Sequence, residues 1–431
     1  MQKAYAVMLL GWATAVGVQG DIVDEADAVR ARYRAGEKDL TEQWNWRGRM
    51  QTDAHGWQPM RFYQRLSAVF AKDWRLWLLT EKDPGERLWN DYTSFYMEHS
   101  LPRLGIRVTA GDLRPGFAQG LVWGRSPVFG GMALPQRRRD SRNLGKRSSA
   151  ESGAIRGLAW RWQRGKWRTV WLVGQGRWDG RLDGAGRVVG LRLDGEHISP
   201  TQLAGRGVLG SWITGGRLAY IGSTWQLGTV WLGQRLDRPL DLSGGKPWAF
   251  VGRGQSMAGI DGQWRWRAVA VYGEFAADPR RGNGLSAGLR WQRGKRRRTS
   301  LALQVRRYSP GFRSFYGGGL SATDATNEEG LSFAYKNRQG RWRLHLFADS
   351  YRRLRPLVSG GAVKAKVVGG VGLGLVGGVW DAEVLYRRNH GWRRVGRWYT
   401  DQVRWTGARR FGRTKWTARA ASKRVVASGG A

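Results

Sequence analysis

The chain has 431 residues and no Cys, and its 73 Lys and Arg against 33 Asp and Glu give a formal net charge of +40. The lack of Cys excludes a disulfide scaffold, a thiolate zinc site and a cysteine nucleophile. The 26 Trp, 13 Tyr and 12 Phe exclude a disordered basic tail, because such tails lack the aromatic side chains that build a core. A charge this large predicts polyanionic partners, and a GC-rich genome is an alternative source of the arginine.

The amino terminus has the pattern of a signal peptide over residues 1–20. Lys3 supplies a positive start, Ala4–Val18 is mostly apolar, and small residues precede a cleavage position after Gly20. An uncleaved anchor or a buried helix is the alternative. Beyond this segment no uncharged apolar run reaches the ~18 residues of a membrane-spanning helix. An exported chain of this kind enters a membrane only as a β-barrel, in which every backbone polar group is paired.

From about Val29 onward, apolar and polar side chains alternate with a period of two, which predicts β-strands. Leu285 and Leu289, for example, share one face, and Arg290 lies on the other. Trp266 and Tyr272 are likewise expected on one apolar face of a single segment. The alternating segments are 29–34, 158–163, 264–272, 285–292, 300–306, 331–336, 341–346 and 380–387.

Tight turns separate these segments. Gly-bearing turns at 163–166, 292–295 and 337–340 each join two alternating runs, and Asp194-Gly195 and Asp261-Gly262 have the composition of two-residue hairpins. Strands of about ten residues have the length that a tilted strand needs to cross a membrane. The pattern therefore predicts an all-β fold, an antiparallel transmembrane β-barrel of roughly 14 to 18 strands.

Two long connections, near residues 125–151 and 309–330, interrupt the hairpins. Both lack periodicity, and both are expected as extracellular loops or as segments folded into the lumen. No boundary divides the rest, so residues 21–431 are predicted to form one outer-membrane barrel domain. The end of the chain, Ser428–Ala431, lacks the terminal aromatic residue usual in outer-membrane barrels, which leaves open a barrel truncated at its C-terminus.

The same alternation fits a soluble β-sandwich, but two features favour the bacterial outer membrane. Trp residues such as Trp160 and Trp342 lie near strand ends, where barrels carry an aromatic girdle. The opposite face carries arginine in strand after strand, which a water-filled lumen tolerates. The residues expected to face the lumen or to bind polyanions are Arg30, Arg32, Arg161, Arg265, Arg267, Arg290, Arg306 and Arg343.

No motif in the sequence predicts catalysis, a cofactor or a metal site. Gly284–Gly288 matches G-x-S-x-G and Gly372–Gly377 matches G-x-G-x-x-G, but both lie in alternating strand patterns without the helix that either motif requires. The five His show no metal-ligand spacing, and pairs such as Asp381 and Glu383 have arginines close by to neutralise them. The sequence therefore predicts that the protein is not an enzyme.

Two motifs near the amino end carry a family resemblance. Residues 81–86 read E-K-D-P-G-E and residues 111–123 read G-D-L-R-P-G-F-A-Q-G-L-V-W. The chain resembles the barrel portion of bacterial outer-membrane helix-hairpin-helix domain-containing proteins, best known from Bacteroidota, and the likeness continues at 306–312 and 327–331. The helix-hairpin-helix repeats themselves are missing, since the stretch between signal and barrel, 21–27, is too short to hold one. The resemblance implies an outer-membrane barrel and no particular activity.

The leading hypothesis is an outer-membrane pore or surface scaffold with a basic lumen that favours anions. Its expected partners are outer-membrane lipid, lipopolysaccharide, the barrel-assembly machinery and anionic solutes. The alternative is a nucleic-acid-binding β protein linked to DNA uptake, because arginine clusters with aromatic neighbours can follow a phosphate backbone. Those clusters are 296–298, 306–307, 352–353 and 393–394.

Overall fold

The structure is a computed structural model and describes only part of the chain. The described residues are 21–22, 42–51, 61–71, 73–83, 85–86, 91–124, 128–129, 132–133, 135, 140–149, 152–195, 197–244, 246, 248–294, 299–321, 325–356, 365–376, 380–393, 396–411 and 414–429. The expected signal peptide at 1–20 and the alternating segment at 29–34 lie outside them.

Strands make up most of the described residues. The first group is β1 (Asp21–Ile22), β2 (Glu42–Gln51), β3 (Arg61–Phe70), β4 (Trp74–Lys82), β5 (Tyr92–Leu101), β6 (Ile106–Leu113), β7 (Val128–Phe129), β8 (Met132–Ala133), β9 (Ile155–Arg164), β10 (Trp167–Leu182), β11 (Val188–Arg192) and β12 (Leu209–Ile221). The second group is β13 (Trp225–Asp241), β14 (Val251–Trp266), β15 (Val269–Asp278), β16 (Gly282–Arg293), β17 (Thr299–Tyr308), β18 (Glu328–Gln339), β19 (Trp342–Arg352), β20 (Ala365–Val376), β21 (Trp380–Arg393), β22 (Gly396–Phe411) and β23 (Thr414–Gly429).

Helical structure in the described residues is confined to two short elements, η1 (Pro102–Leu104) and α2 (Pro200–Ala204). Within that part of the chain, no helix combines the length and the apolar character needed to cross a membrane.

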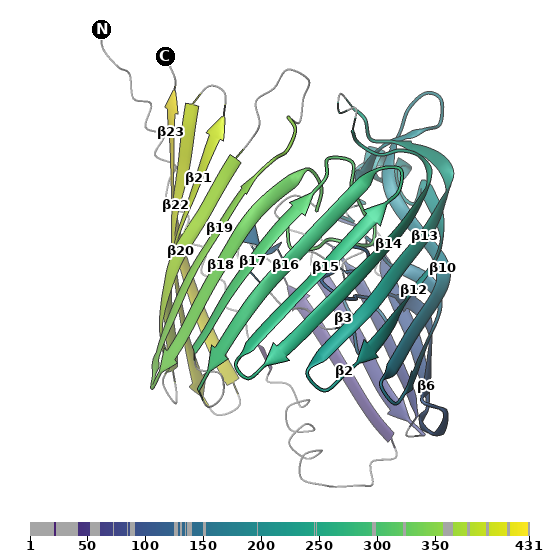
Figure 1. Ribbon diagram of the computed structural model, residues 1–431, viewed down its shortest axis with the longest axis horizontal. Helices are drawn as coiled ribbons and strands as arrows, with labels where there is room; N and C mark the ends of the chain where they lie inside the picture. Colours follow the sequence, from purple (N-terminus) through teal and green to yellow (C-terminus); the bar gives the residue numbers. More distant parts are fainter. Residues whose placement is uncertain are drawn as a thin grey trace.

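The strands form a 21-stranded sheet in which almost every strand pairs antiparallel with the next along the chain. The exceptions are that β6 pairs with β9, and that β10 pairs with β12 as well as with β11, while β11 makes a short parallel pairing with β13. β1 pairs with β23, and among the described strands β2 pairs with β3 alone. Figure 1 shows the tilted strands wrapped into a barrel wall, which confirms the predicted all-β antiparallel barrel.

The sheet has more strands than the roughly 14 to 18 that the sequence predicts. Several turns are very short, such as Gly165–Lys166 and Gly340–Arg341, and so leave more residues for strands. Both glycines have positive φ, 57° and 56°, which a tight hairpin requires. In addition, β1 and β11 are short strands of 2 and 5 residues.

The short turns and the long connections lie at opposite ends of the barrel, because each antiparallel strand reverses direction. The turns after β9, β14 and β18 belong to the short-turn end. The connections from β6 to β9, from β10 to β12 and from β17 to β18 belong to the other end, called the long-loop end below. This asymmetry is the usual arrangement of bacterial outer-membrane barrels.

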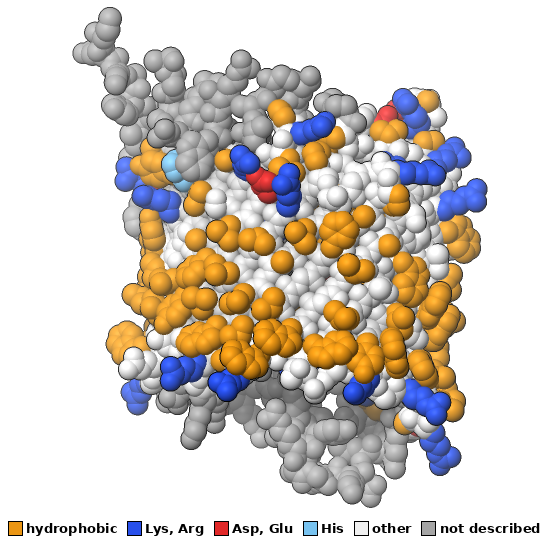
Figure 2. Space-filling view, in the orientation of Figure 1, with side chains coloured by type: hydrophobic (Ala, Val, Ile, Leu, Met, Phe, Trp, Pro, Cys, Tyr) orange, Lys and Arg blue, Asp and Glu red, His pale blue; other side chains and the backbone are white. Residues whose placement is uncertain are grey.

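Alternation along each strand separates an apolar outer face from an inner face. On β17, Leu303 and Val305 point outward with 38% and 49% exposed, whereas Gln304 and Arg306 point inward and are buried. Figure 2 shows the outer apolar side chains as a band across the visible face of the wall, with Lys and Arg along its margins. Members of this outer band include Trp160, Trp171, Leu218, Ile260, Phe275, Leu285, Leu303, Val305, Leu331, Leu373, Val384 and Val403.

The alternation expected across 264–272 is interrupted by a turn. β14 ends at Trp266 and β15 begins at Val269, so Arg267 and Ala268 form the hairpin turn. Trp266 is 54% exposed on the outer face, but Tyr272 is 2% exposed and points inward. The prediction that these two rings share a face was wrong, because the turn reverses the strand between them.

The two Asp-Gly hairpin signals were also wrong. Asp261-Gly262 lies inside β14, where Asp261 faces the lumen and binds Arg217. Asp194-Gly195 lies in the connection that leads from β11 to α2. In both places, pairing with neighbouring strands or loops decides the backbone conformation and overrides the local turn preference.

Candidate functional site

The described parts of the connections from β6 to β9 and from β17 to β18 fold into the lumen and fill the part of it that β9 to β17 enclose. The lumenal plug, as we name it, consists of residues 114–124, 140–149, 309–321 and 325–327. Its apolar side chains share one buried cluster with inward-facing wall residues such as Leu172 and Ile213. The plug members of that cluster are Phe117, Leu121, Val122, Trp123, Leu144, Phe312, Tyr316 and Ala325.

The two halves of the plug are joined by backbone hydrogen bonds. The amide of Gly124 donates to the carbonyl of Tyr316 at 2.8 Å, and the amide of Gly318 donates to that of Gly120 at 2.8 Å. The Ser314 hydroxyl donates to the carbonyl of Val122, also at 2.8 Å. Segments almost two hundred positions apart therefore form one unit inside the barrel.

The wall binds this unit through a buried carboxylate. Glu274 on β15 is 2% exposed and accepts from the amides of Gln119 and Leu121, at 2.7 and 3.1 Å. The indole of Trp123 donates to the carbonyl of Trp231 on β13 at 2.8 Å. The plug is thus held by directed hydrogen bonds as well as by apolar packing.

Two inward arginines also hold the plug in place. Arg217 on β12 is 1% exposed and pairs with Asp140 of the plug at 2.9 Å and with Asp261 of β14 at 2.6 Å. Arg161 on β9 donates to the plug carbonyls of Ser141 and Arg142. These cations bind the protein itself, so they are not available to a solute.

Arg306 is neutralised in a second buried network. On β17 it pairs with Glu328 of β18 and, at 2.7 Å, with Asp349 of β19, and it donates to the Ser332 hydroxyl at 2.6 Å. Arg306, Glu328 and Asp349 all have fully buried side chains. This network ties three neighbouring strands together.

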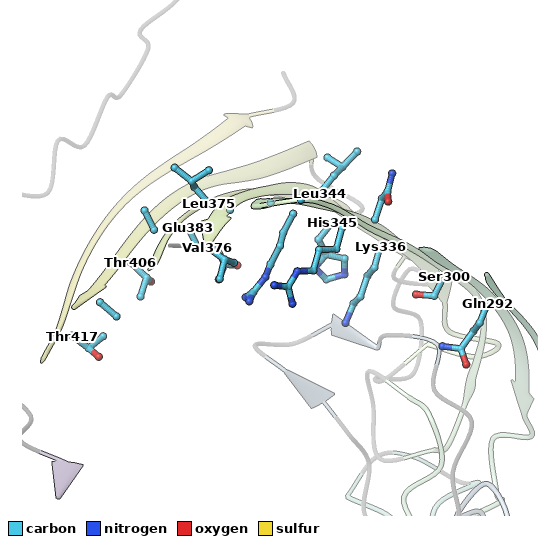
Figure 3. Close-up of a pocket in the computed structure, with 18 of the residues that line it drawn as sticks. Gln292, Ser300, Lys336, Leu344, His345, Leu375, Val376, Glu383, Thr406 and Thr417 are labelled. Atoms are coloured by element: carbon cyan, nitrogen blue, oxygen red, sulfur yellow. The ribbon is translucent and has the colours of Figure 1, made fainter. Parts of the chain in front are cut away.

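Beside the plug, toward the short-turn end, the inner wall of β16 to β23 lines an open cavity of about 720 Å³, called the basic cavity below. Among the described residues that line it, the cationic ones are Arg290, Lys336, Arg338 and Arg343, and Glu383 supplies the one carboxylate. Figure 3 shows Lys336, His345 and Glu383 on the concave side of the wall, with Lys336 and Glu383 on different parts of it, whereas Leu344 and Leu375 point to the convex side. Polar uncharged groups complete the lining, among them Gln292, Ser300, Asn337, Thr406 and Thr417.

The structure places the eight predicted lumen residues in different settings. Arg30 and Arg32 lie outside the described residues. Arg161 and Arg306 point inward and bind protein groups, and Arg290 and Arg343 line the basic cavity. Two further residues complete the set.

Arg265 lies on β14 and alternates with the outward-facing Trp264 and Trp266, which places it on the inner face. Arg267 lies in the β14–β15 turn with φ of 49°, and its guanidinium is 5.0 Å from the Trp266 ring centre. For Arg267 the lumenal assignment was wrong, because a turn residue belongs to the rim and not to the wall.

Sequence reasoning missed several residues that organise the lumen. The sequence did not single out Arg217, Glu274 or Lys336. All three lie on strands, and their side chains point inward. A signal existed for Lys336, which alternates with the outward Leu331 and Tyr335 positions. The partners of Arg217 and Glu274 come from remote plug residues, which no local pattern identifies.

At the long-loop end, a buried histidine joins two connections. The Nδ1 of His197 lies 2.8 Å from Asp91 and its Nε2 lies 3.0 Å from Asp179, while its amide donates to Glu86. Burial opposes the charged ring, but the hydrogen bonds that the ring donates to Asp91 and Asp179 outweigh this effect and raise the pKa of His197 above its usual value. We call these four residues the rim cluster.

The rim cluster has the composition of a metal site but is already hydrogen-bonded. Ligand atoms of Glu86, Asp91 and His197 lie within 4.8 Å of one another. Both ring nitrogens of His197 face carboxylates, however, and Asp91 also accepts from Arg206 at 2.9 Å. The arrangement suits a protonated imidazole between two carboxylates.

The two resemblance motifs occupy structural positions in this architecture. Glu86, from the E-K-D-P-G-E turn, accepts from the amide of Asp83 in its own turn and from that of His197 in the rim cluster. The second motif forms the end of β6 and the first part of the plug, up to Trp123.

No protein-family model matches the chain, and no curated protein matches its sequence. Among solved structures, the chain is similar to Wzi of Escherichia coli, described as an outer membrane protein involved in group 1 capsule assembly and a carbohydrate-binding β-barrel (12% identity, 91% of this chain and 87% of that one, TM-score 0.42). It is similar to OccK2 of Pseudomonas aeruginosa, solved in complex with glucuronate (10% identity, 90% and 96%, TM-score 0.43). It is also similar to OpdQ of Pseudomonas aeruginosa (9% identity, 89% and 96%, TM-score 0.44).

Proposed function

We propose that the chain is a bacterial outer-membrane β-barrel that binds or passes anionic solutes through its partly filled lumen. The outer apolar band supports the membrane location, because residues such as Ile260 and Leu227, 62% and 58% exposed, would otherwise face water. The Lys and Arg along the margins of that band are positioned for lipid and lipopolysaccharide phosphates. Insertion of such a barrel would depend on the barrel-assembly machinery.

The observation that carries the anion preference is the charge of the basic cavity. Four cationic side chains and one carboxylate line it, which leaves an excess of positive charge around a wet, open space. Low-dielectric walls on both sides focus this field and raise the local concentration of anions. The other inner arginines add little to the preference where carboxylates neutralise them, as in the Arg217 and Arg306 networks.

Two measurements test this proposal. Cell fractionation with a heat-modifiability gel is expected to place the protein in the outer membrane as a band that migrates differently before and after boiling. In planar bilayers under a salt gradient, the reversal potential is expected to show preference for chloride over potassium. A cation preference, or a protein that stays in the soluble fraction, would rule the proposal out.

Nucleic-acid binding is the alternative function, and fewer observations support it than support the binding or passage of anionic solutes. Two of its arginine clusters are occupied by carboxylates, since Arg306 is buried with Glu328 and Arg352 pairs with Glu329. A DNA-binding protein of this charge would show steeply salt-dependent affinity, so a binding assay at low and high salt distinguishes the two functions.

A further inference from the structure

The floor of the basic cavity is formed by the glycines of the G-x-G-x-x-G segment, which the proposed function leaves unexplained. Gly372 and Gly374 lie on β20 with their Cα atoms in register with His345 and Arg343 of β19. On the other side, Gly374 is in register with Glu383 of β21. All five residues line the cavity, so the two glycines leave a bare strip between side chains of opposite charge.

This strip has room for more than hydrogen. A Cβ added at Gly374 would meet its nearest neighbours at 3.4 to 3.9 Å, an ordinary contact distance, and one of them is the side chain of Glu383. Close packing against the wall therefore does not require glycine at this position. Because Gly374 has no side chain, the space between Arg343 and Glu383 stays open.

The two sides of the strip differ in chemistry. On the β16–β19 side, Ser300, Lys336 and His345 lie in register across adjacent strands, with Arg343 on the same inner face. On the far side, Glu383 of β21 is in register with Thr406 of β22. Figure 3 shows Lys336 and His345 on one part of the wall, and Glu383, Thr406 and Thr417 on the other.

From this arrangement we infer that the basic cavity is a binding site for small organic anions that also carry hydroxyl groups. The anionic group, a carboxylate or a phosphate, is bound by Arg343 and Lys336 through charge-assisted hydrogen bonds. The carbon chain lies along the strip of Gly372 and Gly374, and hydroxyl groups donate to Glu383 and exchange hydrogen bonds with Thr406. The volume of about 720 Å³ lies in the range of small-molecule sites.

The combination of groups excludes simpler ligands. A purely cationic site would carry no carboxylate opposite its cations, and Glu383 repels an anion that offers it no donor. A neutral polyol would leave Arg343 and Lys336 without an anionic partner. This assignment rests on the proposed function for its lumenal setting, but not on conductance.

The test uses purified full-length protein in detergent and calorimetric titration with four probes. Gluconate combines carboxylate and hydroxyl groups, hexanoate has the carboxylate without the hydroxyl groups, sorbitol has the hydroxyl groups without charge, and glucose 6-phosphate replaces carboxylate by phosphate. Gluconate or glucose 6-phosphate is expected to bind more tightly than hexanoate and sorbitol. Whichever of the two binds more tightly identifies the anionic group.

Variants locate the site. Arg343→Gln and Lys336→Gln are each expected to weaken binding of the preferred probe about tenfold, the range for one charge-assisted hydrogen bond. Gly374→Val fills the strip and is expected to abolish binding, whereas Glu383→Ala is expected to reduce the preference for gluconate over hexanoate. The matched controls are Arg267→Gln, which removes a charge from a turn, and Gly369→Val, on the outward face of the same strand. Neither control is expected to change binding.

Equal binding of gluconate, hexanoate and sorbitol, or full binding by Gly374→Val, would overturn the inference. Heat-modifiable gel mobility of each variant shows that the barrel has folded. The two proposals can be contradicted separately. An anion-selective pore that binds none of the probes would contradict the binding site alone. Binding of gluconate by a protein that never inserts into lipid would contradict the membrane function and support the binding site.

Discussion

Two buried arginines on the inner wall, Arg217 and Arg306, are each paired with their own carboxylates. Arg306 has Glu328, Asp349 and Ser332 as partners, and Arg217 has Asp140 and Asp261. Removing one member of such a set leaves an uncompensated charge and costs about 3 to 5 kcal/mol, far more than the set contributes relative to apolar packing. Arg217 and Arg306 are therefore structural cations, each bound to carboxylates inside the barrel.

His197 is the residue at which pH should act on the rim. Its folded-state pKa is raised above 6.5, so its contribution to stability is fully present below pH about 6.5 and is lost as pH rises through the folded value. The unfolding free energy of the wild type minus that of His197→Gln is expected to fall as the pH rises from below about 6.5 through the folded-state pKa of His197. Denaturant unfolding in vesicles at a series of pH values measures this difference. A difference that stays constant, or rises with pH, would contradict a protonated ring between Asp91 and Asp179.

How well single residues could be predicted depended on how local their environment is. Arg290 and Arg343 were selected from alternation alone, and both line the basic cavity. Arg267 and Tyr272 were misplaced, because one tight turn between Trp266 and Val269 reverses the strand. Alternation assigns a side chain to a face but cannot tell whether that side chain meets water or a remote carboxylate.

Among the larger elements, the plug is the part of the protein that departs most from a simple barrel. Its segments have no periodicity and come from connections far apart in the chain, yet they share backbone hydrogen bonds and one apolar cluster. Loops of this length inside compact proteins usually carry function. Here the plug closes the β9–β17 side of the lumen and leaves the β16–β23 wall exposed to solute.

Glu274 is expected to control how firmly the plug is held. Glu274→Ala leaves the buried amides of Gln119 and Leu121 without their acceptor, which costs about 1 to 3 kcal/mol per group. Hydrogen exchange at residues 117–123 is expected to accelerate about tenfold or more, with larger and noisier single-channel currents. Glu274→Gln, which keeps a carbonyl acceptor, is expected to restore much of the protection.

A matched control is Glu329→Ala, which removes a carboxylate paired with Arg352 at the rim and should leave exchange in the plug unchanged. If Glu274→Ala exchanges at the wild-type rate, the other contacts hold the plug and the carboxylate has no part in it.

Considered as a whole, the molecule has two surfaces with opposite requirements. The outer apolar band needs lipid, and the inner face needs water or polar partners. A long-loop end and a short-turn end give the barrel a direction, with the plug nearer the first and the basic cavity nearer the second. Anionic solutes that reach the cavity would therefore pass beside the plug.

The lipid-facing surface can be tested with one strand. Leu303 lies near the middle of β17 and points outward, whereas Ser300 on the same strand lines the basic cavity. Leu303→Lys places a charge in the apolar layer and is expected to cost about 2 to 4 kcal/mol in vesicles. Ser300→Gln faces water and is expected to change stability by less than about 0.5 kcal/mol. Denaturant unfolding followed by Trp fluorescence measures both, and equal effects would mean that the outer band does not face lipid.

The sequence by itself determined the strands, their antiparallel order and the face of most side chains, because a period of two is a local property of the backbone. It also predicted arginine on the inner face, for example at Arg290 and Arg343, which line the basic cavity. Only the tertiary structure decided which of those cations are neutralised, since Arg217 and Arg306 find carboxylates 22 to 77 residues away. It alone brought the two long connections together as a plug. Contacts across such separations depend on how the curved sheet positions each strand, and no local pattern in the chain encodes that distance.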